Sequence, residues 1–268
     1  MNNYWSNGNI KSVSFTSVGF NLIIRNDAMT NQLRIVHCSD IHLDADGSPH
    51  ADGNKHRNKF ALALEQMRTE DPDLMLIAGD LFDSNRADDD TVLWSMDILA
   101  AQAVPIFMIP GNHDCMSADG IFDRYDFGTI NNLHMLSTPA GEIAWDKTLG
   151  VAVWGKGMQE HTPEYRPLGN CPARPNGCRW YLGIGHGHFV PEGEDTDRSS
   201  PIPMCDIENS PCDYVALGHH HAAMELVTDR TIAAYSGSPT DDIGRGATYA
   251  VAELFVDKKP VLEIKIVD

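Results

Sequence analysis

The chain has 268 residues, of which 42% are hydrophobic and 22% charged, a composition typical of globular proteins rather than disordered or fibrous ones. Its 20 Lys and Arg against 38 Asp and Glu give a net charge of −18, which argues against binding through broad neutralisation of phosphates but allows a local phosphate site held by divalent ions. The sequence has no apolar run of 18 residues and no recognisable signal peptide, so we expect a cytoplasmic protein without a membrane span.

The first residues differ from the rest of the chain. Residues 1–28 are polar and irregular apart from one short apolar run, and Met29 begins a segment typical of a natural start. We therefore predict that 1–28 are an N-terminal extension, disordered or the product of a misassigned start. Length alone allows one or two domains, and we expect 29–268 to form one.

Short apolar runs recur from Leu33 onward, each followed by turn residues, as is typical of buried strands. These runs are 33–36, 74–78, 106–109, 151–154, 181–185 and 214–218. Two helical patterns lie between the first three runs, at 55–69 and at 88–102, and the second opens with carboxylates that suit a helix N-terminus. This alternation predicts βαβ units with parallel strands.

The remaining segments carry weaker signals. Residues 223–268 are strand-like with Gly and Asp turns and little helix. Residues 160–179 and 190–212 are rich in Pro and Gly, so we expect long surface loops there.

Five of the apolar runs lead into side chains that bind metal ions. They are Asp40 and His42, then Asp80 and Asp83, then Asn112 and His113, then His186, and finally His219 and His221. Ligands of α/β sheets bind at the carboxyl ends of strands, so we expect these side chains to converge. Carboxylate, imidazole and amide ligands suit Mn, Fe or Zn better than Ca. Two such ions about 3.5–4 Å apart form a clamp for in-line displacement at phosphorus.

Residue spacing supports this interpretation. Asp40 and His42 are two residues apart, so in an extended segment both side chains project to the same side, and the same holds for His219 and His221. His220 would then point away. We expect His188 and His220 to lie outside the ligand set, and no special role for His37, His50, His56, His134 and His161.

The ordered set D-x-H, G-D-x-x-D, G-N-H-D, H and G-H-x-H spans about 33–240 and resembles the signature of the calcineurin-like metallophosphoesterase superfamily. Segments 35–43, 79–83, 214–219 and 235–239 are most similar to its DNA-repair exonuclease branch, the SbcD-type nuclease subunit. The resemblance implies an α/β fold, a four-layer αββα sandwich with two mixed β-sheets, here without a cap domain.

The resemblance also implies a role for each residue. Asp40, His42 and His221 would hold the first of two divalent metal ions, with Mn as the first expectation and Fe or Zn as alternatives. Asn112, His186 and His219 would hold the second ion, and Asp80 would bridge both. Metal-activated water would attack phosphorus in line. His113 would protonate or stabilise the leaving oxygen as a general acid, and Asp83 would orient or tune His113.

Three functions are compatible with this pattern. The first is a phosphoesterase that resembles DNA-repair exonucleases and acts on DNA, with an ATPase partner as in that branch. The second is a phosphoesterase for a small molecule such as a nucleotide or cyclic nucleotide. The third is a metal-binding module without catalysis. The net charge and a chain that ends soon after the catalytic motifs, where the usual ATPase-binding region would follow, weigh against the first.

The six cysteines are too few for a disulfide scaffold in a chain of this length. Four of them form two C-x6-C pairs, Cys171 with Cys178 and Cys205 with Cys212. We expect ordinary reduced thiols, with a structural zinc site as the alternative, although this spacing is wider than the two to four residues usual for zinc.

Overall fold

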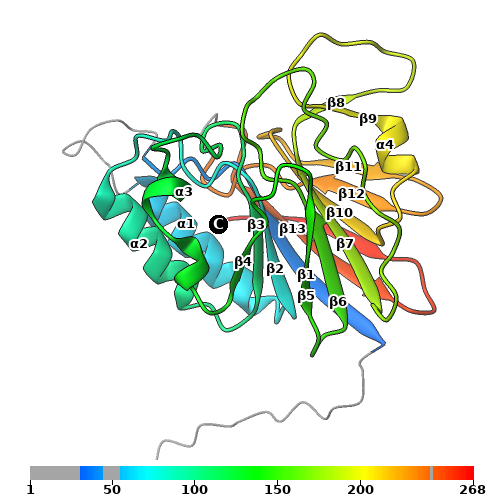
Figure 1. Ribbon diagram of the computed structural model, residues 1–268. Helices are drawn as coiled ribbons and strands as arrows, with labels where there is room; N and C mark the ends of the chain where they lie inside the picture. Colours follow the sequence, from blue (N-terminus) through cyan, green and yellow to red (C-terminus); the bar gives the residue numbers. More distant parts are fainter. Residues whose placement is uncertain (1–30, 45–54, 242–243) are drawn as a thin grey trace, which may run out of the picture.

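A computed structural model describes residues 31–44, 55–241 and 244–268, so the predicted extension 1–28 lies outside the described residues. Two mixed sheets of six strands each pack face to face (Figure 1). The order in the first sheet is β14 (Val261–Ile266), β13 (Thr248–Phe255), β1 (Gln32–Cys38), β2 (Leu74–Ala78), β3 (Ile106–Ile109) and β4 (Leu133–Met135). The order in the second is β11 (Met224–Val227), β12 (Ile232–Tyr235), β10 (Tyr214–Gly218), β7 (Trp180–His186), β6 (Val151–Gly155) and β5 (Glu142–Asp146).

Each sheet has a parallel centre that matches the predicted βαβ units. Strands β1 to β4 are parallel to one another, as are β6, β7, β10 and β12, whereas β13, β14, β5 and β11 pair antiparallel. The parallel strands of both sheets therefore end at one edge of the sandwich, and β2 packs against β7 and β10 across the interface. Side chains that follow these strands can meet there.

Helices cover the outer face of the first sheet, namely α1 (Lys55–Thr69), α2 (Asp89–Ala100), α3 (Ile121–Arg124) and the short 3₁₀ helix at Phe127–Thr129 (Figure 1). As predicted, Phe60, Leu64 and Met67 of α1 are buried. The side chain of Asp88 caps α2 by accepting a hydrogen bond from the Thr91 N–H at 2.7 Å.

Three apolar layers hold these elements together. Strand β2 shows why the central runs are apolar throughout: Leu74, Leu76 and Ala78 face the second sheet, whereas Met75 and Ile77 face the helices. A strand buried on both faces has no polar alternation. The third layer covers the outer face of the second sheet, where α4 (Met204–Glu208) and the loops around it pack. The αββα class is thus confirmed, with a fourth layer that contains only one short helix among the described residues.

The prediction of a loop over 190–212 was wrong in part. This segment contains β9 (Pro201–Pro203), which pairs with β8 (His188–Val190), and it also contains α4. Proline lacks an N–H donor and is typical of turns, so the many prolines in this segment predicted a loop. They do not exclude a three-residue edge strand or a five-residue helix. The loop over 160–179 is as predicted, since it contains no helix or strand.

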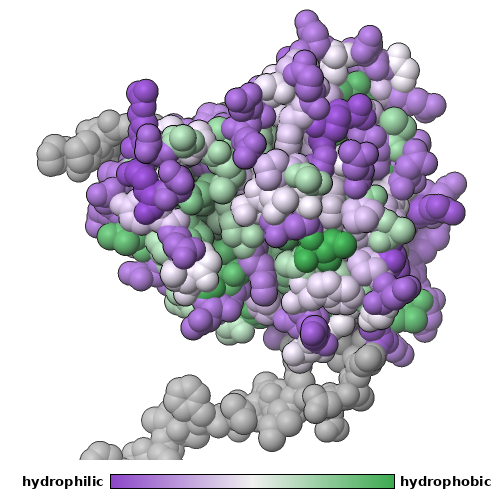
Figure 2. Space-filling view, viewed as in Figure 1, coloured by the Kyte–Doolittle hydropathy of each residue, from purple (hydrophilic) through white to green (hydrophobic). Residues whose placement is uncertain are grey.

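The surface is largely hydrophilic on the face drawn in Figure 2, where strongly hydrophobic side chains form separate small patches. Among the described residues, no helix is both long and apolar enough to cross a membrane.

Candidate metal centre

All nine predicted site residues meet where the two sheets adjoin. Seven of them form three groups of potential metal ligands, whose ligand atoms lie within 4.8 Å of one another in each group: Asp40, His42 and His221; His42, Asp83 and His113; and Asp40, Asp80 and His186. The other two, Asn112 and His219, join them through hydrogen bonds. The predicted convergence of the strand ends is therefore observed.

The backbone leaves these strands in unusual conformations. Asp40, His42, Asp80 and His219 have φ angles of 54°, 50°, 52° and 101°, in or near the left-handed region that costs a non-glycine residue about 1–3 kcal/mol. Gly79 also has a positive φ, and a Cβ there would lie 2.5 Å from His186 Nδ1, so only glycine fits. Strained backbone of this kind concentrates at functional sites, because it directs side chains toward positions that a regular strand or helix would not allow.

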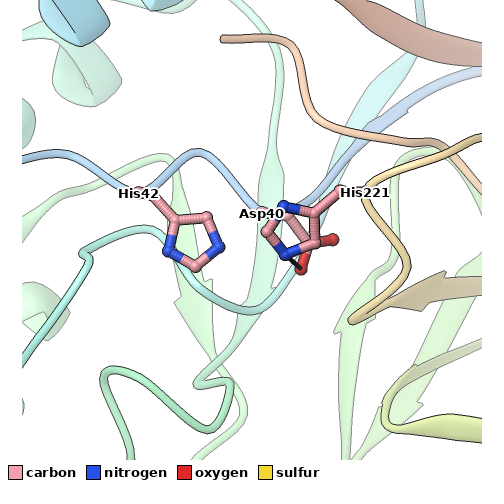
Figure 3. Close-up of side chains that lie close together, drawn as sticks. All are labelled: Asp40, His42 and His221. Atoms are coloured by element: carbon pink, nitrogen blue, oxygen red, sulfur yellow. Dashed lines mark ion pairs between the residues drawn. The ribbon is translucent and has the colours of Figure 1, made fainter. Parts of the chain in front are cut away.

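The first group is drawn in Figure 3, with Asp40 and His42 projecting from the segment after β1 and His221 approaching from the segment after β10. His221 Nε2 lies 3.8 Å from Asp40 Oδ1. The His42 Nδ1–H donates to Asp83 Oδ1 at 3.2 Å, which leaves Nε2 with a free lone pair. That buried Nε2 atom has no hydrogen-bond partner in the described part of the chain. A buried nitrogen lone pair facing carboxylates is the arrangement that a divalent ion satisfies.

The second group lies around His186. Its Nδ1–H donates to the Ala78 carbonyl at 2.7 Å, so Nε2 is free to bind a metal, and that atom lies 3.3 Å from Asp80 Oδ2. Asn112 Oδ1 lies 2.9 Å from both His186 Nε2 and His219 Nδ1. A common position is therefore faced by the His186 imidazole, whose tautomer is fixed, by the Asn112 amide oxygen and by the Asp80 carboxylate.

Asp80 stands between the two groups. Its Oδ1 accepts a hydrogen bond from the His113 N–H at 2.9 Å. Its Oδ2 lies 3.8 Å from His42 Nε2 and 3.3 Å from His186 Nε2. A single carboxylate oxygen is therefore within reach of both sets of ligands.

Burial and charge perturb these groups strongly. Burial alone would raise the pKa of Asp80, but His186 and the other histidines around it hold that pKa well below its usual range. Burial alone would lower the pKa of His186, and Asp80 instead raises it to about 9. Burial raises the pKa of Asp40, and burial next to His186 lowers the pKa of His219 to about 3. A buried cluster of this kind is balanced by bound cations, so the residues fit a metal centre.

His113 and Asp83 lie beside the first group. His113 Nδ1 donates to the backbone carbonyl of Asp83 at 2.7 Å, whereas the Asp83 carboxylate is 3.7 Å from the same nitrogen and closer to His42. The His113 ring is half-exposed and meets the His42 ring edge to face, with centroids 4.6 Å apart. Its free Nε2 can therefore donate or accept a proton at the solvent side of the site.

Two further residues adjoin the site but had no predicted role. Asp114 is fully buried and accepts three backbone N–H bonds, from Gly111 at 2.7 Å, Leu81 at 2.8 Å and Phe82 at 3.1 Å. It thereby joins the loops after β2 and β3. Burial, reinforced by the nearby Asp80, raises the pKa of Asp114 to about 7.

His161 is the second such residue. It comes from the connection between β6 and β7, and its ring centroid lies 5.5 Å from that of His219. Ser200 Oγ lies 2.9 Å from its Nδ1. No feature of the surrounding sequence identifies this histidine, because a loop of irregular length brings it to the site.

The other described histidines and the cysteines belong to none of the three groups, and His50 lies outside the described residues. The ring of His188 stacks on that of His220, with centroids 5.6 Å apart, and His37 is buried against the Tyr214 hydroxyl, 3.0 Å from its Nδ1. Within the described residues no cysteine belongs to a group of three or more ligands, so the C-x6-C pairs do not assemble a zinc site there.

Comparison of the sequence with models of known protein families identifies the family of this chain. Residues 33–223 match the family model described as calcineurin-like phosphoesterase. The chain belongs to this family. It is therefore a metallophosphoesterase, a hydrolase of phosphate ester bonds, and the family's dependence on metal agrees with the ligand groups described above.

A curated relative supports the predicted branch. The chain is 26% identical over 268 aligned residues to SbcD, a component of the nuclease SbcCD of Bacillus subtilis (strain 168), in an alignment that covers 85% of this chain and 67% of the relative. The phosphoesterase is thus similar to the nuclease component whose motifs its sequence resembles.

Solved structures share the fold at lower identity. A protein from Thermus thermophilus superposes with a TM-score of 0.57 at 10% identity, covering 88% of this chain and 99% of that one. A dimetal phosphatase from Danio rerio superposes with a TM-score of 0.54 at 11% identity, covering 88% of this chain and 96% of that one. These likenesses show the fold of the phosphoesterase.

Proposed function

We propose that this phosphoesterase hydrolyses phosphodiester or phosphomonoester bonds with two divalent metal ions. The position of Asp80 carries the proposal, because its Oδ2 is within 3.8 Å of His42 Nε2 on one side and 3.3 Å of His186 Nε2 on the other. Asp40, His42 and His221 would hold one ion, and Asn112, His186 and His219 the other. The mixed nitrogen and oxygen ligands favour Mn, with Fe or Zn as alternatives.

The ions and the protein have separate tasks. When bound, two ions make a water molecule nucleophilic at neutral pH and neutralise the charge on the phosphate oxygens. The chain supplies their placement, since Asp83 and the Ala78 carbonyl each bind the second ring nitrogen of a ligand histidine and thereby select the tautomer with a free Nε2. Nucleophilic attack by water requires no covalent bond to the protein.

His113 is the candidate proton donor. Its Nδ1–H is already held by the Asp83 carbonyl at 2.7 Å, so in the imidazolium form Nε2–H is the proton available for transfer to a leaving oxygen. The Asp83 carboxylate lies 3.7 Å from the same Nδ1. General acid catalysis of this kind contributes about 10²–10⁴-fold to a rate.

DNA is the substrate favoured by sequence similarity. The relative at 26% identity is a nuclease component, so we propose cleavage of DNA. The exonuclease branch that the sequence resembles acts with an ATPase partner, and we extend the proposal to such a partner. The net charge of −18 favours a second candidate, a nucleotide or cyclic nucleotide, because a long polyanion requires extended basic surface whereas one phosphate requires only the metal centre.

A substrate panel distinguishes the two candidates. The Mn²⁺-loaded protein would be incubated with single-stranded DNA, double-stranded DNA, and cyclic and linear nucleotides, at low and at physiological salt. The His113→Ala variant, purified in parallel, controls for contaminating nucleases. Release of nucleotides from DNA supports the nuclease, hydrolysis confined to free nucleotides supports the second candidate, and cleavage of neither contradicts the proposal.

A further inference from the structure

Two cysteines from different parts of the second sheet's outer layer are in contact. Cys171 Sγ lies 3.9 Å from Cys212 Sγ, and the two residues are 41 positions apart. The first belongs to the connection between β6 and β7, and the second precedes β10. The C-x6-C spacing would pair each of them with a different cysteine, so this contact arises from the fold and not from the local sequence.

We propose that Cys171 and Cys212 are a thiol–disulfide exchange site, which low-molecular-weight disulfides such as glutathione disulfide convert to an intramolecular bridge. Bond formation requires the sulfur atoms to approach from 3.9 Å to about 2.05 Å.

Other contacts hold the two segments together without the bridge. The Tyr181 hydroxyl donates to the Pro172 carbonyl at 3.1 Å and lies 3.6 Å from Cys171 Sγ. Asp213, which follows Cys212, pairs with the Arg174 guanidinium and accepts the Tyr181 N–H at 2.9 Å. These contacts hold both segments against Tyr181. The entropy of bringing them together is therefore already lost in the folded protein, which favours the bridge over mixed disulfides.

Packing gives the two sulfurs different roles. Cys212 is buried, and it fits because Gly183 has no side chain: a Cβ there would lie 3.2 Å from Cys212 Sγ. Cys171 is half-buried and thus open to a reagent. Contact with Cys212, together with Tyr181 and the charge of Lys156, lowers the pKa of Cys171 despite its partial burial. Cys171 is thus the attacking thiol and Cys212 the resolving one.

The exchange balances in two steps. The Cys171 thiolate attacks one sulfur of the reagent disulfide, forms a mixed disulfide and expels one thiolate. The Cys212 sulfur, after losing its proton, attacks the Cys171 sulfur and expels the second thiolate. The two cysteines lose two electrons and two protons, and the reagent disulfide is reduced to two thiols.

The test follows the bridge in the full chain loaded with Mn²⁺. After incubation with glutathione disulfide, peptide mapping without reduction should find Cys171 joined to Cys212, and the Tm should rise by roughly 5 °C or more. The Cys171→Ser variant should lose both effects, whereas Cys178→Ser, from the same loop, should keep them. Circular dichroism of each variant verifies its folding.

Three outcomes would overturn the proposal. They are glutathione adducts without an intramolecular bridge, a bridge between Cys171 and Cys178, and loss of the Tm increase in Cys178→Ser but not in Cys171→Ser. Mapping of the unmodified sequence decides the first two without any variant.

Discussion

Asp83 contacts two histidines of the candidate metal centre through two different groups. Its carboxylate Oδ1 lies 3.2 Å from His42 Nδ1, and its backbone carbonyl lies 2.7 Å from His113 Nδ1. The side chain therefore fixes the tautomer of a metal-ligand candidate, while the main chain orients the candidate proton donor. Substitution of Asp83 separates these functions, because it removes only the first.

The Asp83→Ala variant should bind Mn²⁺ about 10- to 100-fold more weakly than the unmodified protein. The reason is that His42 loses the acceptor that keeps its Nε2 free for the metal. Calorimetric titration of metal-free protein measures this affinity, with Asp97→Ala on the exposed face of α2 as the matched control. Unchanged affinity in Asp83→Ala would show that Asp83 does not support the metal centre.

The His113→Ala variant should keep its bound metal and lose about 10²–10⁴-fold in kcat. The imidazole is the proposed proton donor and stands outside the proposed ligand set. Metal content by mass spectrometry and steady-state kinetics, measured on the same preparation, provide the comparison. A variant that has lost its metal together with its activity would refute the assignment of His113 as proton donor.

The Asp114→Asn variant should lower the free energy of unfolding by about 1–3 kcal/mol. The carboxylate accepts the N–H groups of Leu81, Phe82 and Gly111, and the amide cannot accept all three. Urea denaturation of the metal-free protein measures the difference. Equal stability of variant and unmodified protein would mean that these bonds contribute nothing net to folding.

His37 should make stability depend on pH. Burial lowers its pKa from 6.5 to about 3. The unfolded chain therefore binds a proton as the pH falls below 6.5, whereas the folded protein does not, so the native state loses up to about 1.4 kcal/mol per pH unit between pH 6.5 and pH 3. Denaturation of metal-free protein between pH 4.5 and 7 should give a shallower dependence for His37→Gln. The same slope in both proteins would contradict this account.

Much of the fold was predictable because the central strands are buried on both faces. The predicted runs 74–78, 106–109 and 214–218 coincide with β2, β3 and β10. The helix predicted at 55–69 also coincides with α1, whose buried residues recur at helical spacing. The loop predicted over 190–212 was wrong in part, because a three-residue strand and a five-residue helix are too short to show a period. The short elements β4, β5 and α3 were not predicted either.

The candidate site was predictable where residues follow strands and not where loops bring them in. Asp40, Asp80 and His186 each stand at or just after a strand end, so chain order alone indicated that they would meet. His161 reaches His219 from a connection without regular structure, and Cys171 meets Cys212 across 41 residues. Such contacts depend on the path of irregular backbone, which leaves no periodic signal in the sequence.

The dependence of hydrolysis on bound metal tests the central proposal most directly. Metal-stripped protein would be titrated with Mn²⁺ while hydrolysis of bis-p-nitrophenyl phosphate is followed, with Asp80→Asn measured in parallel. We expect no turnover in the presence of chelator and full activity when two ions are bound per chain. In Asp80→Asn, which lacks the proposed bridging carboxylate, binding of one ion should no longer affect binding of the other. Turnover that persists in chelator, or full activity with a single bound ion, would contradict the proposal.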